Sequence, residues 1–474
     1  MSAADLDLCY MTATEVIEAF NANTLSPVEL LKAVIARAEA INPSLNAISQ
    51  QYFDRALKEA RRAEACYRGK HAAPRPLEGI PIAIKDFHAV KDEITTFGSK
   101  VFESHRATHS APTVDRLLKA GAIMHLRSIT PEFASSATTH SPLWGVTKNP
   151  WNRAYSPGGS TGGGAAAVAA GFATVADGTD GGGSIRIPAS ACGLVGYLAP
   201  FGRNPLDRDH PVESLLRYGP ITRSIADAAL MQNVMSGPHA DDQCSLRDRL
   251  TLPNRFESIR GWKIALSYDL GYFAVDPEVT KAVKAAARVF EGLGCQVEEV
   301  GLPWHLGILE AMYAHWEGMA ASVLAKYLPR WRYEMNPHVV HLIEKGRQRS
   351  AADLYRVNAV RGEMYRSLEP ILRKYDVLIC PTLAVPSVAA DHDNLDPCFA
   401  IAGKKVDAYL QWVMTYPFNL VSQVPVLSVP CGVARSGVPI GLQIVGRTYD
   451  DLSVFRAAAA FECASPWRDR RPDL

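Results

Sequence analysis

Short apolar runs rich in β-branched residues recur along the chain and predict buried strands. The first covers residues 80–84, and similar runs follow at 122–126, 263–267, 377–380, 426–429 and 440–445. Continuous apolar runs of this length, bounded by turn residues, are typical of strands that are buried on both faces of a sheet. We therefore expect a sheet in the interior of the protein.

Segments with apolar residues at helical spacing lie before, between and after these runs. Thr12 is placed to cap a first helix, Ser26-Pro27 opens a second at residues 28–41, and Asn42-Pro43 is expected to end it. Further helices are predicted at 52–67, 110–120, 277–293 and 452–463. The alternation of strands and helices points to an α/β protein in which helices cover both faces of a sheet.

No repeat and no low-complexity linker divides the chain, so residues 1–474 are predicted to form a single domain. Within it, residues 1–70 read as an N-terminal helical segment and residues 304–372 as a helical insertion. The insertion carries the aromatic residues Trp304, Tyr313, Trp316, Trp331 and Tyr333. These side chains either pack as a core layer or wall a substrate pocket, and the sequence leaves both alternatives open.

The charge balance narrows the possible partners. The 474 residues are 47% hydrophobic, which is enough for a large core, and 50 basic residues face 49 acidic ones. A net charge of +1 gives no electrostatic reason to bind nucleic acid or an anionic membrane surface. We expect neither partner, and a small-molecule substrate fits this balance.

Cysteine usage and the N-terminus indicate a cytoplasmic protein without a metal centre. The nine cysteines form no CxxC pair and no cluster with metal-ligand spacing, and an odd number favours reduced thiols over a disulfide framework. Residues 1–8 contain Asp5 and Asp7 and lack the basic and apolar regions of a signal peptide. Apolar runs stay short of the ~18 residues that a membrane span needs. No cofactor and no metal are expected.

The strongest chemical signal lies at residues 156–188, where two glycine clusters each carry a serine, Ser160 and Ser184. Glycine runs suit unusual backbone conformations and close approach to a ligand. A phosphate-binding loop is disfavoured because the segment lacks GxxxxGK[ST] and follows no predicted strand. Residues 158–162 do satisfy GxSxG, so a nucleophile elbow at Ser160 remains the alternative hydrolase hypothesis. An elbow, however, needs a preceding strand and a histidine downstream, and the last histidine is His392.

Four stretches resemble one known family. Residues 149–188 are similar to the signature segment of the amidase-signature family, and Gly-Ile-Pro-Ile-Ala-Ile-Lys-Asp at 79–86 is similar to its catalytic-lysine motif. Residues 375–382 and 418–446 resemble its C-terminal half. The resemblance implies a central mixed, mostly parallel β-sheet covered by helices on both faces. It also implies an amidohydrolase that cleaves a C–N amide bond.

Carried over residue by residue, the resemblance implies Ser184 as the nucleophile, Ser160 as a bridging serine held by a cis peptide, and Lys85 as the base. Gly181, Gly182, Gly183 and Ser184 would supply the backbone N–H groups of an oxyanion hole. The chemistry agrees, because a serine hydroxyl needs a neighbouring base and a lysine serves as one only when burial lowers its pKa.

The neighbours of these residues receive structural roles. Asp86 is expected to point away from Lys85, since a close carboxylate would raise the lysine pKa. Asp180 and Arg186 are expected to hold the glycine loop as an ion pair or hydrogen-bond set. Gly181 stands where the family commonly has threonine or isoleucine, which predicts a looser oxyanion loop or wider access.

For substrate contacts the resemblance points to Ala134 and Ser135, and to Thr161, which replaces the usual serine. The small side chains at 134 and 135 predict a roomy acyl side, and the aromatic helices favour an aryl or apolar amide, ester or carbamate.

Two other functions remain open, as does the oligomeric state, a homodimer included. The family contains an amidotransferase subunit that works with a partner, but such members usually continue the SIR motif with Gln-Pro, and this chain has Ile187-Pro188. A non-catalytic binding protein on the same fold would not need all three catalytic side chains.

Overall fold

A large central sheet organises the computed structural model, which describes residues 3–210 and 212–474. Within these residues the sheet has eleven strands in the order β1-β3-β2-β6-β8-β7-β14-β15-β11-β9-β10. Their bounds, in that order, are Ile48–Gln51, Ile123–Ser128, Pro81–Lys85, Val175–Asp180, Arg217–Thr222, Val195–Leu198, Val426–Val433, Pro439–Val445, Val377–Pro381, Lys263–Leu266 and Gln296–Glu299. All six strands expected from apolar runs are present.

The sheet is mixed, as expected, but antiparallel pairs prevail. In the described chain, four neighbouring pairs are parallel, namely β2–β3, β2–β6, β9–β11 and β9–β10. Six are antiparallel, namely β1–β3, β6–β8, β7–β8, β7–β14, β14–β15 and β11–β15. The expectation of a mostly parallel sheet is therefore wrong. Strands β14 and β15 form a hairpin. Strand β8 runs antiparallel to β6, and β7 runs antiparallel to β14.

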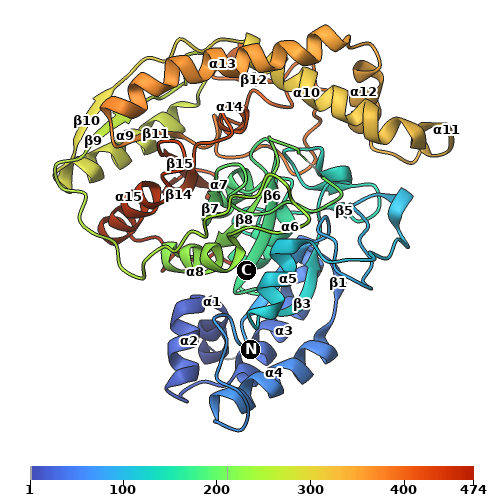
Figure 1. Cartoon of the computed structure of the whole chain (residues 1–474), viewed down its shortest axis with the longest axis vertical. Coiled ribbons are helices and arrows are strands. Elements are labelled where there is room, and N and C mark those ends of the chain that lie inside the picture. The colour runs from blue at the N-terminus through green and yellow to red at the C-terminus, as the bar shows by residue number, and fades with distance from the viewer. Residues whose placement is uncertain (1–2, 211) are drawn as a thin grey trace.

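Helices cover both faces of the sheet. Successive residues of a strand point to opposite faces, so neighbouring residues of one strand pack against different helical layers. Ile82 and Ile84 of β2 pack with the N-terminal helices and with α5 (Pro112–Lys119) and α8 (Ile225–Met235). Ala83, between them, packs with the helices of the glycine-rich segment on the other face. The two-sided α/β arrangement is thus confirmed (Figure 1).

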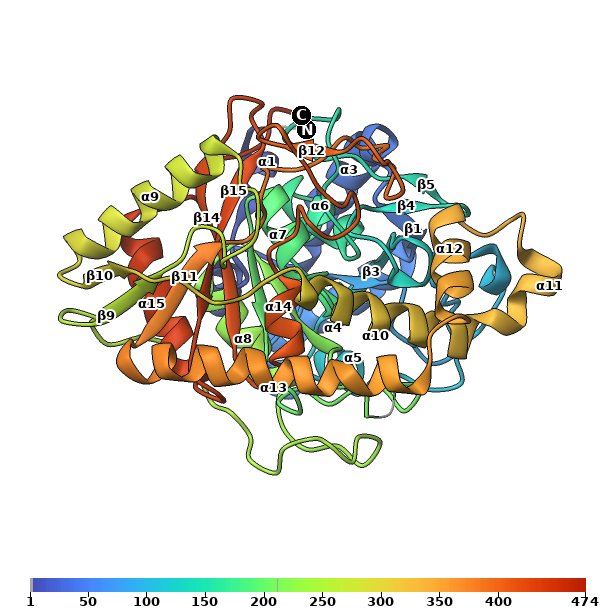
Figure 2. The same cartoon turned by 90° about the horizontal axis from the view of Figure 1, so that it is seen from above.

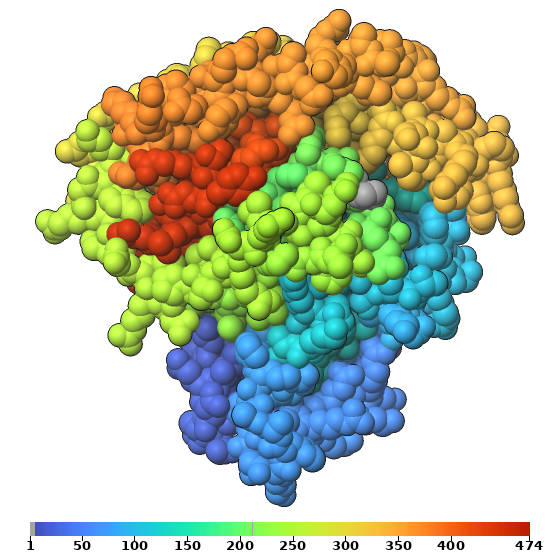
Figure 3. Space-filling model, viewed as in Figure 1, coloured from blue at the N-terminus to red at the C-terminus, as the bar shows by residue number. Residues whose placement is uncertain are grey.

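The N-terminal helices lie together at one end of the molecule (Figures 1 and 3). They are α1 (Ala3–Tyr10), α2 (Ala13–Asn21), α3 (Pro27–Leu45) and α4 (Phe53–Tyr67). Thr12 caps α2 in a capping box with Glu15, and Ser26 caps α3 as predicted.

The predicted stop of α3 at Asn42-Pro43 is wrong, since the helix continues to Leu45. Pro43 removes one backbone donor, but the following residues bond back to Asn42: its carbonyl accepts from Asn46 N–H, and its side chain accepts from Ala47 N–H. Asn46, at a left-handed φ of 55°, then ends the helix.

The remaining helices on the sheet come from all parts of the sequence. They are α6 (Gly162–Ala169), α7 (Arg186–Cys192), α9 (Pro277–Gly292), α14 (Tyr416–Leu420) and α15 (Asp451–Ala464). Two small hairpins, β4 (His140–Ser141) with β5 (Gly145–Val146) and β12 (Ala400–Ile401) with β13 (Lys404–Lys405), stand outside the main sheet. No helix in the described ranges is both long enough and apolar enough to span a membrane.

Residues 304–372 form an outer helical layer that covers one side of the molecule (Figures 1 and 3). It contains α10 (Gly307–Leu324), α11 (Leu328–Trp331), α12 (Pro337–Gly346) and α13 (Ala351–Lys374), and Figure 2 shows α13 running along the edge of the fold. Trp304 is buried against Phe418, with ring centroids 5.8 Å apart, whereas Tyr333 is 96% exposed. The aromatic residues of this segment therefore do not share one role.

Asp227 ties the N-terminal helices to the sheet layer. Its buried carboxylate accepts hydrogen bonds from the backbone N–H groups of Ala13 and Thr14, both at 2.9 Å. We expect Asp227→Ala to lower the free energy of unfolding by about 1–3 kcal/mol, because two donors lose their acceptor. Urea denaturation measures this. Glu18→Ala, at an exposed position of α2, the helix that Asp227 contacts, is the control, and an equal loss in both variants would contradict the assignment.

Candidate functional site

Lys85 ends strand β2 with its side chain entirely removed from solvent. Its Nζ donates to the hydroxyl of Ser160 at 2.7 Å and to the hydroxyl of Thr179 at 2.7 Å. The strand places the lysine there because β2 pairs with β3 on one side and with β6, which carries Thr179, on the other. Lys85 and Ser160, 75 residues apart in the chain, are thus brought together as predicted.

Ser160 follows a cis peptide bond between Gly159 and Ser160, in agreement with the expectation drawn from the family resemblance. Position 159 has no room for a side chain, since a Cβ there would overlap the carbonyl oxygens of Ser136 and Thr138. The next residue, Thr161, is buried and its N–H donates to the carbonyl of Ser184 at 3.2 Å. The two glycine clusters are therefore bonded directly to each other.

Ser184 lies in the loop between β6 and α7, at the end of three consecutive glycines. Gly183 has a φ of 133°, and a Cβ atom there would overlap the hydroxyl of Thr415. That hydroxyl donates to the carbonyl of Gly182 at 2.7 Å. Gly182 and Ser184 remain partly exposed, whereas Lys85 and Ser160 lie beneath the surface. Thr415 thus holds the buried side of the loop, while Gly182 and Ser184 stay accessible to solvent.

Asp180 and Arg186 brace this loop, as predicted. Both side chains are fully buried, and the guanidinium makes two 3.0 Å hydrogen bonds to the carboxylate, one to each oxygen. Asn419 donates to the same carboxylate at 2.9 Å. The ends of the glycine loop are therefore fixed by a bidentate ion pair, in addition to the contacts of the glycines themselves.

Burial controls the charge of Lys85. Loss of solvation lowers the pKa of Lys85 from 10.5 to about 7, while the charges of Asp177 and Asp180 act in the opposite direction. Asp86 turns away as expected: its carboxylate accepts from the backbone N–H and the hydroxyl of Thr96. A substantial fraction of Lys85 is consequently neutral near pH 7 and able to accept a proton.

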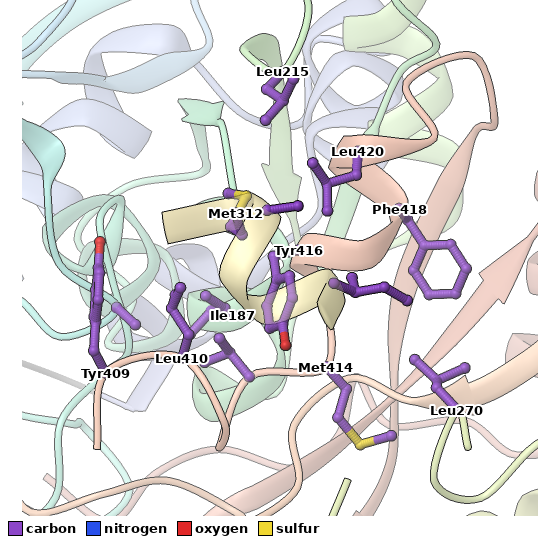
Figure 4. Close-up of a cluster of buried hydrophobic side chains, with 14 of the residues drawn as sticks. Ile187, Leu215, Leu270, Met312, Tyr409, Leu410, Met414, Tyr416, Phe418 and Leu420 are labelled. Carbon is purple, nitrogen blue, oxygen red and sulfur yellow. The ribbon is translucent and has the colours of Figure 1, made fainter. Parts of the chain in front are cut away.

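Helix α10 covers the glycine loop. A Cβ atom at Gly181 would lie 3.0 Å from the indole ring of Trp316, and one at Gly182 would lie 3.1 Å from the terminal methyl of Met312. Trp316 therefore occupies the space beside Gly181, which does not support wider access there. A looser loop stays a prediction. Met312 and Ile187 belong to the apolar cluster around Tyr416 shown in Figure 4.

The predicted acyl-pocket residues lie in a tight turn beside the cis peptide. Phe133 and Ala134 both have left-handed backbones, with φ of 51° and 55°, and Ser135 is buried. The residues that follow them, Ser136 and Thr138, contact Gly159. The Thr161 hydroxyl donates inward to the carbonyl of Thr179 at 3.4 Å. Direct substrate contacts of Ala134, Ser135 and Thr161 stay predictions.

Sequence reasoning missed two residues of this site, Thr179 and Thr415, and did not distinguish a third, Trp316, from its aromatic neighbours. Thr179 lies two positions outside the glycine cluster, so its place in the segment could have drawn attention to it. Trp316 was only one of several aromatic candidates, and Thr415 carried no sequence signal at all. One group in the described chain has ligand atoms close enough for a metal ion, His109, Asp207 and Asp209, but His109 and Asp207 already contact each other at 2.6 Å.

Comparison with known proteins agrees with this geometry. The family model described as Amidase matches residues 29–455. An acylamidase from Rhodococcus erythropolis is 36% identical over 98% of both chains. A glutamyl-tRNA(Gln) amidotransferase subunit from Geotalea daltonii is 32% identical over 99% of this chain and 100% of its own. The crystal structure of a bacterial aryl acylamidase of the amidase-signature family superposes with a TM-score of 0.89, at 30% identity over 97% of both chains.

The buried Lys85 makes stability depend on pH. Its pKa is lower in the folded than in the unfolded chain, so unfolding takes up a proton between about pH 7 and 10.5, and the folded state gains stability as the pH rises through this window. Lys85→Met removes the effect. We expect its unfolding free energy relative to wild type to fall by about 1 kcal/mol per pH unit between pH 8 and 10.

Urea denaturation at each pH measures this difference. The loss of the two hydroxyl hydrogen bonds adds an offset that does not change with pH. Lys58→Met, on the exposed side of α4, is the control. A flat difference for Lys85→Met would contradict the assigned burial of the charge.

Proposed function

Because the chain belongs to the amidase family and hydrolyses amide bonds, we propose that Ser184 is its nucleophile, Ser160 its proton bridge and Lys85 its base. The observation that carries this proposal is the 2.7 Å hydrogen bond from the buried Lys85 amino group to Ser160, on a segment bonded to Ser184. No histidine is required, since a desolvated lysine can act as a base near neutral pH.

The proposed reaction runs through an acyl-enzyme. Neutral Lys85 takes the proton of Ser160 while Ser160 takes that of Ser184, and the oxygen of Ser184 attacks the substrate carbonyl. Backbone N–H groups of Gly181, Gly182, Gly183 and Ser184 stabilise the negative oxygen of the tetrahedral intermediate, each such donor being worth about 2.7–4 kcal/mol. Ser160 then gives one proton to the leaving amine while Lys85 returns its proton to Ser160, and the C–N bond breaks. Water, which loses a proton to the same relay, hydrolyses the ester, and Ser184 regains its proton.

The proposed substrates are small amides with an apolar or aryl group, with related esters and carbamates open to the same acyl-enzyme. The half-buried Trp316 and the buried Met312 beside the oxyanion loop support an apolar wall, and the named activities of the acylamidase and aryl acylamidase relatives agree with it. Trp304 and Tyr416 are buried in the core and are not part of this wall.

We further propose that the protein is a stand-alone, cytoplasmic hydrolase rather than an amidotransferase subunit. Both a monomer and a homodimer are compatible with this proposal. Ile187 follows the SIR motif and packs under the catalytic loop, where its side chain lies against Gly158 and Gly183. An apolar residue in this position supports the loop from the core. Glutaminase activity that rises on addition of a co-purifying partner would overturn this proposal.

Labelling by a fluorophosphonate probe tests the assignment of the serines. We expect Ser184→Ala to abolish labelling and turnover, because the attacking oxygen is gone. Lys85→Ala and Ser160→Ala are expected to reduce kcat/KM by about 10²-fold or more while the folded state persists. Ser136→Ala, next to the site but outside the proton path, is the control. Labelling lost in Ser160→Ala but kept in Ser184→Ala would instead establish the elbow mechanism.

Trp316→Ala tests the apolar wall. Removing the indole is expected to raise the kcat/KM ratio of bulky over small acyl anilides by about tenfold or more, since a cavity opens beside Gly181. Trp331→Ala, in the same helical layer, is the control. An unchanged ratio would remove Trp316 from the wall, and a wild-type preference for short aliphatic amides over anilides would contradict the proposed substrate class.

A further inference from the structure

Two buried titratable side chains stand directly behind Lys85 and take no part in the proposed proton path. Asp177 of β6 and His88, three residues after Lys85, are both withdrawn from solvent, and His88 Nε2 lies 3.3 Å from Asp177 Oδ2. Apart from this contact, Asp177 Oδ2 and both ring nitrogens of His88 have no partner within hydrogen-bond geometry in the described chain. A buried acid with so few partners is costly and calls for an explanation.

The pair is connected to Lys85 through the backbone. The other oxygen of Asp177, Oδ1, accepts the N–H of Lys85 at 2.8 Å. The N–H of His88 in turn donates to the carbonyl of Lys85 at 3.1 Å, and Arg127 donates to the carbonyls of both residues. The ring of His88 stands edge-on to Tyr218, at 4.4 Å between centroids. Lys85 and the turn after it are therefore held between Asp177 and Arg127.

We propose that Asp177 and His88 are positioning residues for Lys85: the neutral His88 ring holds Asp177 as a carboxylate, and this carboxylate keeps Lys85 a strong enough base. The inference rests on the proposed role of Lys85. Fully buried lysines without such a counter-charge can fall to pKa values of about 5–6, where they are weak bases, whereas catalysis is most effective with a pKa near the working pH.

Asp177 differs from the other titratable and charged groups nearby. The others are Asp86 in the turn after β2, Arg127 in β3, Asp180 in β6, Arg186 in α7 and His210 in the loop before β8. Asp180 is paired with Arg186 and raises the pKa of Lys85 less than Asp177 does, and Asp86 is bonded to Thr96. Asp177 is the acid with the larger effect on Lys85, and within the described residues it makes no ion pair with a lysine or an arginine.

The protonation of His88, Asp177 and Lys85 is linked. Burial, with the charges of Lys85 and Arg127, keeps the pKa of His88 well below its ordinary value, so the ring stays neutral and can offer an N–H to Asp177. Burial raises the pKa of Asp177 to about 7, opposed by its hydrogen bond from the N–H of Lys85 and by the charges of Arg127 and Lys85. The ionisation of Asp177 and that of Lys85 therefore influence each other in the same pH range.

The pH profile of kcat/KM tests the proposal, because its acidic limb reports the pKa of the free enzyme's base. Asp177→Asn keeps an acceptor for the Lys85 N–H but removes the charge. We expect the limb to move to lower pH by about one unit. His88→Leu leaves Asp177 without a facing donor, which favours the protonated acid, and is expected to move the limb in the same direction. His88→Gln restores a donor and is expected to bring the limb back.

Asp86→Asn is the matched control, since it removes an equally buried acid adjacent to Lys85 that points elsewhere. Its limb is expected to stay in place. The proposal is overturned if folded His88→Leu and Asp177→Asn keep the wild-type limb, or if Asp86→Asn moves it as far. Should Asp177→Asn not fold, the two His88 variants decide. Substantial turnover by Lys85→Ala would instead defeat the proposed function itself.

Discussion

The amino group of Lys85 loses all contact with water and keeps two hydroxyl partners, Ser160 and Thr179. The rest of the site follows from this arrangement. Burial lowers the pKa of Lys85, so that the amine is partly neutral near pH 7. Because no water reaches the amine, its hydrogen-bond partners have to come from the fold itself. The sheet provides one of these partners, because β2 and β6 are neighbouring strands and Lys85 and Thr179 lie side by side at their ends.

The glycine clusters depend on close packing rather than on flexibility. Gly159 has carbonyl oxygens where a side chain would stand, Gly183 has Thr415, and Gly181 has Trp316. Each contact comes from a different part of the chain, so the loops are held between the outer helical layer, the C-terminal segment and the turn at residues 136–138. The buried ion pair of Asp180 and Arg186 joins the two ends of the loop that carries Ser184. A preorganised set of backbone donors needs such a support, since donors that must reorganise during the reaction lose much of their effect.

Patterns that depend on near neighbours in the chain were the informative ones. Apolar runs located six of the eleven described strands of the main sheet, and the caps at Thr12 and Ser26 were correct, because both signals depend on neighbours within a few residues. The runs missed β6, β8 and β7 in the middle of the sheet. Pro43 misled, since the helix tolerates it when Asn42 satisfies the groups that follow. Strand direction was predicted poorly. Whether β8 runs with or against β6 depends on the path of the chain between them, which no local pattern records.

By itself, the sequence determined the local chemistry: two serines in glycine clusters, a lysine at the end of an apolar strand, and the conformational freedom that the glycines provide. These features lie within short stretches, and a short stretch carries its own backbone preferences. Only the tertiary structure decided that Lys85 reaches Ser160, that Trp316 fills the space beside Gly181, and that His88 and Asp177 stand behind the lysine. Distances between residues far apart in the chain, and the burial that shifts a pKa, arise only when the whole chain is packed.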